Sequence, residues 1–376
     1  MDRRYDRIIA VGLRRWKAHN LRAILSSCTR EVHFVADAAQ AEKLRPTARD
    51  AIAIWGATPG PALHALATAT GATLLRLEDG FIRSVGLGSD LIPPQSLVLD
   101  PVGIYFDATA PSALEILLQT AAFDDEKLAR AAAARAFIAA EGLTKYNIEA
   151  RIPPRWTPQG RRVVLVPGQV ESDASIALGG TGVRSNLALL EQVRAACPDA
   201  YIVYKPHPDV MSGNRRGRTA RREAEALADW IETECSIVSC IEACDALHTI
   251  TSLSGFDAML RGKPVTTWGM PFYAGWGLTE DRAPDARALL RRTRRLTLDE
   301  IVAGALLQYP LYWNEADERE TNCESVLSSI AHNRNMLEIS RKLEGLRRGP
   351  TRRLIRKLRT LTRAWLGTNS RDRWWN

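Results

Sequence analysis

The sequence has few cysteines and few histidines, six of each among 376 residues, and it lacks any long apolar run. The cysteines show no metal-like pairing, so we expect buried free thiols and no metal. No apolar stretch reaches the ~20 residues that a helix needs to span a bilayer. No apolar segment of the signal-peptide kind follows the charged N-terminus, so we expect a cytoplasmic protein.

A net positive charge is also lacking over most of the chain, although the formal net charge of the whole is +8. Residues 341–376 hold twelve Lys or Arg and two Asp or Glu, a net +10, which leaves −2 for the other 340 residues. A uniformly basic surface of the kind that binds nucleic acid is therefore not supported, and we expect no nucleic-acid partner.

The basic segment 341–376 has the pattern of an amphipathic helix. Apolar residues recur among its cations at helical spacing, at Leu354, Leu358, Leu361 and Trp365. Such a helix suits an anionic membrane surface, and Trp374 and Trp375 suit the interface. The alternative is a solvated tail. We expect this segment to hold the protein peripherally at the inner membrane.

Short β-branched runs alternate with helical stretches, which indicates βαβ units and parallel sheets. The first set of predicted strands is 8–12, 32–36, 51–55 and 73–77. After a Pro-Pro joint the predicted strands are 162–167, 201–204, 246–250 and 264–268, with helices at 186–196 and 218–233. We therefore predict an α/β protein with two Rossmann-like domains facing a cleft, residues 1–150 and 151–320, and a helical basic tail, 321–376.

Charged residues follow the predicted strand 73–77, at the position where open α/β sheets bind ligands. Glu78 and Asp79 are adjacent carboxylates, and Arg83 and two spaced glycines follow them. One carboxylate is suited to acid or base chemistry, while Arg83 is suited to holding an anion. The alternative is a structural Asp-Gly turn with a surface ion pair.

Two further loops follow strands of the second set. Asp173 or Glu171 is a candidate nucleophile or base, and the alternative for Asp173 is a helix N-cap. In the segment Lys205-Pro-His-Pro the two prolines preset the direction of His207. Lys205 and His207 are suited to neutralising a phosphate and protonating a leaving oxygen.

The segment 251–280 reads as a turn, a helix, a strand and an aromatic-glycine loop. Ser252, Ser254 and Gly255 lie at the predicted helix start, where unpaired N–H groups suit a phosphate. Asp257 either stabilises the helix dipole or bonds ribose hydroxyls. The loop Pro-Phe-Tyr-Ala-Gly-Trp-Gly indicates contact with a ligand, and the alternative is an ordinary strand–loop crossing.

Taken together, these motifs resemble the capsule polysaccharide biosynthesis family of KpsC type, the bacterial β-Kdo transferases. The matching segments lie in order between about residues 8 and 315, at 78–89, 103–109, 144–147, 168–175, 204–210, 251–257, 271–278 and 291–298. The resemblance implies a GT-B-like fold and retaining transfer of Kdo from CMP-Kdo to a lyso- or phosphatidylglycerol-linked glycolipid in capsule synthesis and export. It implies no metal and no cofactor apart from the donor substrate.

The resemblance also implies roles for the motif residues. Retention by double displacement needs a carboxylate nucleophile and a group that handles the acceptor proton. We assign Asp173 as the nucleophile and Asp79 as the acid/base, an assignment that is open to reversal, with Glu78 and His207 as further catalytic candidates. The donor would be bound by Lys205, His207, Ser252, Ser254, Gly255, Asp257 and Arg83.

Two departures from the family pattern leave alternatives open. Family members typically carry two such modules, whereas this chain has one, so we expect a single linkage type or a partner among the capsule synthesis and export proteins. Asp257 stands where the family has Glu, one methylene longer. The alternatives are a transferase of the same fold with another activated sugar, and a non-catalytic, glycolipid-binding component of capsule assembly or export.

Overall fold

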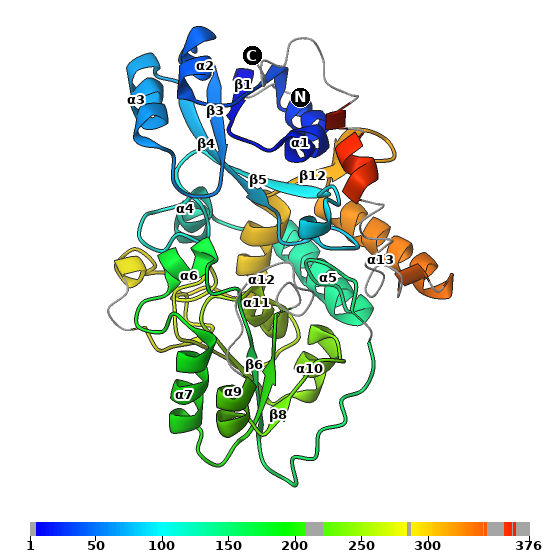
Figure 1. The fold of residues 1–376 in the computed structure, drawn as a ribbon. Helices are drawn as coiled ribbons and strands as arrows, with labels where there is room; N and C mark the ends of the chain where they lie inside the picture. Colours follow the sequence, from blue (N-terminus) through cyan, green and yellow to red (C-terminus); the bar gives the residue numbers. More distant parts are fainter. Residues whose placement is uncertain are drawn as a thin grey trace. The chain divides into compact units, whose positions relative to one another are not determined.

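The computed structural model describes residues 5–149, 151–207, 221–283, 287–340, 342–343, 357–362 and 364–365. The chain forms two compact units, of which unit 1 comprises residues 1–104, 145–148 and 306–376 and unit 2 comprises residues 105–144 and 149–305 (Figure 1). Residues 105–144 thus belong to unit 2, although they lie within the predicted N-terminal domain 1–150.

Unit 1 is built on a seven-stranded sheet with the order β13-β12-β5-β4-β3-β1-β2. Its strands are β1 (Tyr5–Val11), β2 (Thr29–Val35), β3 (Ala51–Trp55), β4 (Thr73–Asp79), β5 (Ser96–Asp100), β12 (Leu311–Asn314) and β13 (Arg319–Thr321). The four strands predicted from the sequence, β1 to β4, are parallel. The sequence analysis missed β5, β12 and β13, which extend the sheet in antiparallel fashion.

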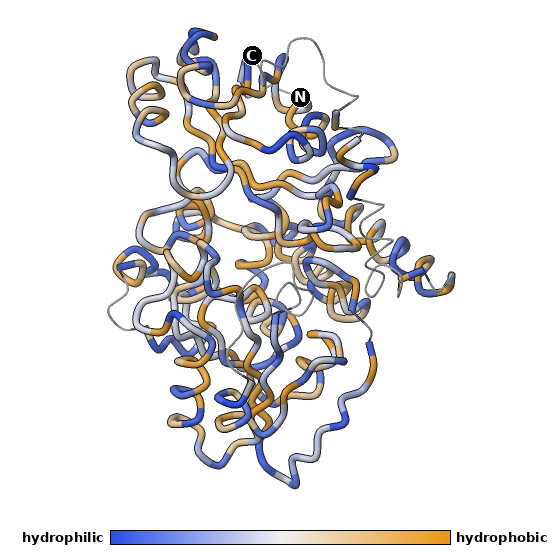
Figure 2. Tube along the Cα trace, viewed as in Figure 1, coloured by the Kyte–Doolittle hydropathy of each residue, from blue (hydrophilic) through white to orange (hydrophobic). Residues whose placement is uncertain are grey.

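Helices cover both faces of this sheet. They are α1 (Arg15–Ser27), α2 (Ala38–Lys43) and α3 (Pro61–Thr70), with η1 (Gly88–Asp90) and α13 (Cys323–Ile339) elsewhere in the unit. Along β1, Ile8 and Ala10 share a core with α1, whereas Ile9 and Val11 share one with α2 and α3. Successive strand side chains point to opposite faces, so one apolar strand fills both layers. Figure 2 shows the central strands as largely hydrophobic.

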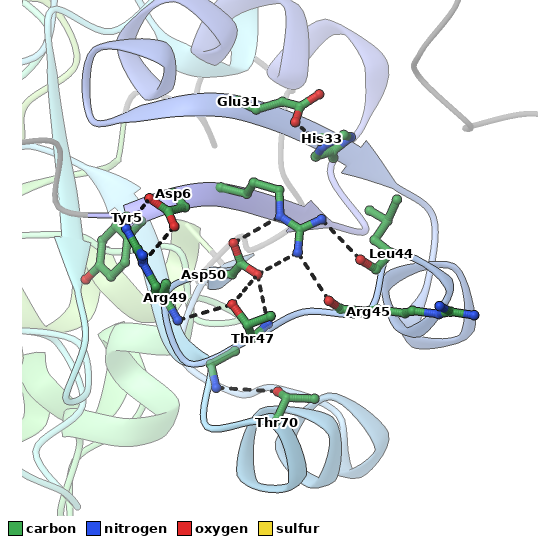
Figure 3. Close-up of polar contacts among 12 residues, drawn as sticks. Tyr5, Asp6, Glu31, His33, Leu44, Arg45, Thr47, Arg49, Asp50 and Thr70 are labelled. Atoms are coloured by element: carbon green, nitrogen blue, oxygen red, sulfur yellow. Dashed lines mark hydrogen bonds and ion pairs between the residues drawn. The ribbon is translucent and has the colours of Figure 1, made fainter.

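A polar network closes the amino-terminal edge of the β1–β3 pair (Figure 3). Asp50, only 1% exposed, accepts hydrogen bonds from Arg7 Nε at 3.0 Å and from the backbone N–H of Thr47 at 2.8 Å. Arg7 also donates to the carbonyl oxygens of Leu44 and Arg45. This network ties the β1 strand to the turn that precedes β3, at the edge opposite the predicted site.

Unit 2 contains a six-stranded, entirely parallel sheet with the order β11-β10-β9-β6-β7-β8. Its strands are β6 (Val163–Pro167), β7 (Tyr201–Lys205), β8 (Trp230–Ile231), β9 (Ala246–Thr249), β10 (Val265–Thr267) and β11 (Glu280–Asp281). The four strands predicted for this region are confirmed as β6, β7, β9 and β10. Their residues are almost wholly buried, as expected of a sheet covered on both faces.

The helices of unit 2 include α4 (Ala113–Thr120), α5 (Asp125–Glu141), α6 (Ala174–Gly179), α7 (Asn186–Ala196), α9 (Arg221–Leu227), α10 (Ile237–Ala243), α11 (Leu253–Met259), η2 (Arg287–Leu290) and α12 (Leu298–Val302). A further helical segment, η3 (Ala303–Gln308), runs across the boundary of the two units. Gly142, with φ 61°, is the C-cap at which α5 ends.

The predicted helix 218–233 is wrong at its end. Helix α9 stops at Leu227, and Trp230–Ile231 form strand β8 beside β7. Asp229 causes the change, because its carboxylate accepts from the backbone N–H of Ile202 and pairs with Arg194. Residues 218–220 lie outside the described part of the chain.

All six cysteines are free, and five of them are buried. Burial raises the pKa of the Cys240 and Cys244 thiols, the latter to about 12. The prediction of buried free thiols is thus confirmed except at half-buried Cys197. Among the described residues, no helix is long and apolar enough to cross a membrane.

Candidate active site

The predicted residues of unit 1 gather at the end of β4. Glu78 and Asp79 are its last two residues, and they lie opposite Val98 and Leu97 of the neighbouring strand β5. Gly80 follows, and a Cβ there would come within 2.2 Å of the Ser96 hydroxyl oxygen. Only glycine therefore lets the chain turn off the sheet at this point, so the carboxylate pair is displayed by a tightly packed turn.

Asp79 is held in its charged form by Arg83. The Arg83 Nε atom lies 2.8 Å from an Asp79 carboxylate oxygen, and Arg83 is only 2% exposed. Its two terminal nitrogens donate to Ser84 Oγ and to the Ile92 carbonyl oxygen. The guanidinium of Arg83 is therefore engaged on three sides, which favours a structural role over the predicted binding of the donor anion.

The two adjacent carboxyl groups differ in acidity. Burial, followed by the charge of Asp79, raises the pKa of Glu78 to about 7. Burial alone would also raise the pKa of Asp79, but the charges of Arg83, Lys145 and Lys17 lower it overall. Paired carboxyl groups with pKa values pushed apart are typical of acid/base sites. Glu78, rather than Asp79, is thus the group that gains and loses a proton near neutral pH.

Lys17 and Trp55 lie near this carboxyl pair, and neither was predicted from the sequence. Lys17 lies in the first turn of α1, and Trp55 is the last residue of β3. The Lys17 Nζ atom lies 3.2 Å from the centroid of the Trp55 ring. Trp55 could have been found from the sequence, because it ends a predicted strand at the same sheet edge as Glu78.

The predicted residues of unit 2 gather at one edge of the second sheet. Strands β9, β6 and β7 are neighbours and parallel, so the loops that follow them share the carboxyl edge. Gln169, after β6, links two of these loops, because its side-chain oxygen accepts from the Thr251 N–H and its amide donates to Thr251 Oγ1. The Gln169 N–H in turn donates to the Asn186 side chain at the start of α7. This network was not predicted.

Asp173 lies in the loop after β6 and is partly exposed. It is the N-cap of α6, and its carboxylate accepts from the Ser175 N–H at 3.3 Å. Glu171, the other candidate, accepts from the Asn186 N–H at 2.7 Å and so serves the loop itself.

Lys205 and His207 follow β7. Lys205 is buried, and its ammonium donates to the Cys235 carbonyl oxygen at 2.6 Å and lies 3.1 Å from a Glu149 carboxylate oxygen. Glu149 also accepts from the Ile237 N–H. Lys205 thus balances the half-buried carboxylate of Glu149 in this structure, and a phosphate would compete with Glu149 for it. His207 is half-buried in the loop after the strand.

The start of α11 holds the remaining predicted residues. Ser252 is the N-cap, and its hydroxyl accepts from the Ser254 N–H at 3.1 Å. Tyr273 donates its hydroxyl to the Ser252 carbonyl oxygen at 2.5 Å, and a Cβ on Gly255 would come within 2.1 Å of that hydroxyl. Asp257 is 6% exposed, and burial raises its pKa to about 7 against the charge of Arg261.

The aromatic-glycine loop is held by a buried ion cluster that the sequence analysis missed. Arg292 donates to the carbonyl oxygens of Pro271 and Ala274 at 2.7 and 2.9 Å, and its Nε donates to Glu115. The loop therefore has a fixed backbone, and through Tyr273 it determines the shape of the α11 start.

The amino-acid sequence places this arrangement in a family. Residues 50–312 match the family profile described as capsule polysaccharide biosynthesis protein. The chain belongs to this family. The resemblance inferred from the sequence motifs is thereby confirmed.

Two curated proteins are similar to this chain in sequence. The chain is 38% identical, over 97% of its length and 50% of the relative, to the capsule polysaccharide modification protein LipA of Neisseria meningitidis serogroup B. It is 39% identical, over 76% of its length and 64% of the relative, to the lipopolysaccharide-processing protein LpsZ of Rhizobium meliloti. The chain thus spans about half the length of LipA.

Two solved structures have the same fold. A Thermosulfurimonas dismutans KpsC structure described as a β-Kdo 2,7 transferase is 35% identical, with a TM-score of 0.71, over 87% of this chain and 99% of that one. A second KpsC structure from this organism, described as a β-Kdo 2,4 transferase, is 32% identical, with a TM-score of 0.73, over 88% and 99%. The predicted GT-B-like α/β fold with two Rossmann-type sheets is confirmed.

Part of the predicted tail helix is described. Residues 357–362 and 364–365 are helical, with Leu358, Leu361 and Trp365 exposed by 52, 37 and 61%. Lys357 lies 3.4 Å from Asp90, and the Arg15 guanidinium lies 3.9 Å from the Trp365 ring centroid. Leu354, Ile355, Trp374 and Trp375 lie outside the described residues.

Proposed function

We propose that the chain is a glycosyltransferase of capsule polysaccharide synthesis that transfers Kdo from CMP-Kdo, with retention, to a phosphatidylglycerol-linked glycolipid. The observation that carries this proposal is the joint match in sequence and fold to KpsC β-Kdo transferase structures, each covered over 99% of its length. The carboxyl pair Glu78-Asp79, with divergent pKa values, supports transfer chemistry over simple binding.

In this proposal Asp173 is the nucleophile. Its carboxylate oxygen forms a bond to the anomeric carbon of Kdo while the bond from that carbon to the CMP phosphate oxygen breaks. An acceptor hydroxyl then attacks the same carbon from the opposite face, and Asp173 departs as a carboxylate. Two inversions give net retention. The partly exposed position and weak N-cap bond of Asp173 support this role.

Glu78 takes the proton of the attacking hydroxyl. A base works best when its pKa lies close to the working pH, and Glu78 meets this condition with a pKa of about 7. Asp79, paired with Arg83, remains ionised and keeps the pKa of Glu78 high. The pair thus divides the work, with Glu78 as the acid/base and Asp79 as its electrostatic partner, whereas the motifs alone led us to assign Asp79 as the acid/base.

The donor is held by the loops after β7 and β9. Ser252, Ser254 and His207 offer hydroxyl, N–H and imidazole donors to the CMP phosphate, and Gly255 leaves room beside Tyr273. Asp257 accepts from ribose hydroxyls in this proposal, and the charge of Arg261 favours its ionised form against the effect of burial. Lys205 contributes to phosphate binding if phosphate displaces Glu149.

The direct test is a transfer assay. The purified protein is incubated with CMP-Kdo, generated in situ, and a synthetic lipid acceptor that ends in Kdo, and mass spectrometry detects added Kdo. We expect one addition in the wild type and a loss of at least about 10²-fold in the Asp173→Asn variant. A covalent adduct of Kdo with the protein, absent from Asp173→Asn, would support the nucleophile directly.

A matched control makes the same change at a different N-cap. Asp37 caps α2 by accepting from the Gln40 N–H, so Asp37→Asn likewise replaces an N-cap carboxylate by an amide, without touching the proposed site. It should keep full transfer. CMP binding without Kdo addition would indicate that the protein uses another activated sugar as its donor. Glycolipid capture without CMP binding would indicate a non-catalytic assembly or export component.

We further propose that the protein acts at the cytoplasmic face of the inner membrane, held there by residues 341–376. The exposed apolar residues Leu358 and Trp365 beside Lys357 support this location. A second module or another capsule synthesis or export protein would supply any alternate linkage.

A further inference from the structure

Lys17 is a cation without a carboxylate partner in a neighbourhood that contains two. The charges of Asp79 and Glu78 both act on it, yet neither lies within ion-pair distance among the described residues. Instead its Nζ atom lies 3.2 Å from the centroid of the Trp55 ring and 5.5 Å from that of Trp16. An aromatic face attracts an ammonium group, but it is not an oxygen acceptor for any of the three N–H donors of that group.

The position of Lys17 does not serve its helix. It lies in the first turn of α1 beside Arg14 and Arg15, and this turn has no acidic residue and no side-chain cap. The helix dipole places partial positive charge here, so three cations in this turn are unfavourable unless an anion joins them. Lys17 is nevertheless half-buried, and burial lowers its pKa to about 8, which leaves it mostly charged at neutral pH.

The surroundings of Lys17 place it beside the proposed base. Trp55 ends β3 and pairs with Leu77 in β4, so Glu78 is one residue beyond the partner of Trp55. Gly56, with φ 86°, turns the chain away directly after Trp55. The other charged groups that act on Lys17 are Arg83 and Arg14. One sheet edge thus displays a desolvated ammonium next to a carboxyl group that accepts protons.

We propose that Lys17, held against Trp55, binds the carboxylate of the acidic sugar at the end of the acceptor and so places the acceptor hydroxyl at Glu78. This inference rests on the proposed transferase function and deepens it. An acidic sugar such as Kdo carries a carboxylate close to its hydroxyls, so one charge-assisted bond orients the whole ring. Lys17 is accordingly a specificity residue, because a neutral acceptor forfeits that bond.

The test compares two acceptors on two proteins. One acceptor is the synthetic lipid that ends in Kdo, and the other carries a primary amide in place of the terminal carboxylate. Lys17→Met should raise KM for the acidic acceptor about 10-fold or more, as expected for a lost charge-assisted hydrogen bond, and change kcat much less. The preference of the wild type for the acidic acceptor should disappear in Lys17→Met. Lys17→Arg should restore most of it.

The controls separate this role from others. Lys43→Met removes an exposed lysine of the same unit and should leave both KM values unchanged. If Lys17 only tunes Glu78, the pH profile will move while the acceptor preference remains, and the inference is wrong. An unchanged preference with an unchanged profile overturns it as well.

Failure of the transferase function is distinguishable from failure of this inference. Calorimetric titration of the acidic acceptor without any donor measures binding alone. A wild type that binds this acceptor more tightly than the amide, with the difference lost in Lys17→Met, supports the inference even if no Kdo is transferred. A wild type that binds both equally, or neither, overturns it.

Discussion

Arg292 and Glu115 form a buried ion pair across 177 positions of sequence, with the Arg292 Nε donating to a Glu115 carboxylate oxygen at 2.9 Å. Both side chains are almost inaccessible, at 2 and 6% exposure. Arg291 binds the other carboxylate oxygen of Glu115, and Arg292 extends to two carbonyl oxygens of the aromatic-glycine loop. One carboxylate therefore organises the loop that shapes the start of α11.

Glu115→Gln should destabilise the protein markedly. It leaves two arginines without their counter-charge, and breaking one partner of a buried pair costs about 3 to 5 kcal/mol. Denaturant unfolding measures this change in the free energy of unfolding. Asp299→Asn is the matched control, because the Arg135–Asp299 pair is about one third exposed and should cost about 1 kcal/mol or less. Equal losses of unfolding free energy in the two variants would contradict this role of the buried Glu115 ion pairs.

Glu78→Gln should reduce kcat on the order of 10²-fold and flatten the acid limb of the pH–rate profile. Glu78 is a base when deprotonated, so the wild-type rate should rise as pH increases through about 7. Asp79→Asn removes a negative charge that raises the pKa of Glu78, so its acid limb should move to lower pH. Steady-state kinetics against pH measures both. A wild-type profile that is flat across neutral pH would exclude Glu78 as the base.

Asp50→Asn should lower the free energy of unfolding by about 2 kcal/mol at neutral pH, because it weakens charge-assisted bonds to Arg7. Burial would raise the pKa of Asp50, but the bonds from Arg7 and Thr47 lower it below its ordinary 3.8. A carboxyl group whose pKa is lower in the folded than in the unfolded protein stabilises the folded state at pH values above its unfolded pKa. This stabilisation is lost as the pH falls through the folded pKa. The difference in the free energy of unfolding between the wild type and Asp50→Asn should therefore persist at neutral pH and shrink below pH 3.8.

The control for this prediction lies in the same network (Figure 3). Asp6 pairs with Arg49, whose side chain is 77% exposed, so Asp6→Asn should cost less than about 1 kcal/mol at any pH. Urea unfolding of both variants across this pH range is the measurement. A difference in unfolding free energy between the wild type and Asp50→Asn that does not change with pH would contradict the lowered pKa of Asp50.

Removal of residues 341–376 should abolish binding to phosphatidylglycerol liposomes and leave turnover of a water-soluble acceptor intact. The double change Leu358→Gln and Leu361→Gln should weaken binding in the full chain, because both side chains are exposed. Liposome co-sedimentation measures the bound fraction. Met336→Gln, which alters an exposed apolar residue of α13, should have no effect. Undiminished sedimentation of the truncated chain would disprove the anchor.

Local patterns in the sequence were enough to predict most strands and the position of the candidate site residues at strand ends. Apolar runs identified β1 to β4 and most of the second sheet, whose predicted strands are buried on both faces and therefore apolar throughout. The carboxyl-end rule then located Glu78, Asp173 and Ser252 at the correct sheet edges. Strands β5, β12 and β13 escaped prediction, and the pairing of β12 with β5 joins segments far apart in the chain, which carries no local signal.

The amino-acid sequence by itself determined which residues stand at the ends of which strands and to which family the chain belongs. Only the tertiary structure decided what those residues do. Lys205 faces Glu149, Arg83 faces Asp79, and Glu78 is a weaker acid than its neighbour. The physical reason is that ion pairing and desolvation depend on which segments meet in space. A carboxylate's acidity is therefore a property of its surroundings in the fold and not of its motif.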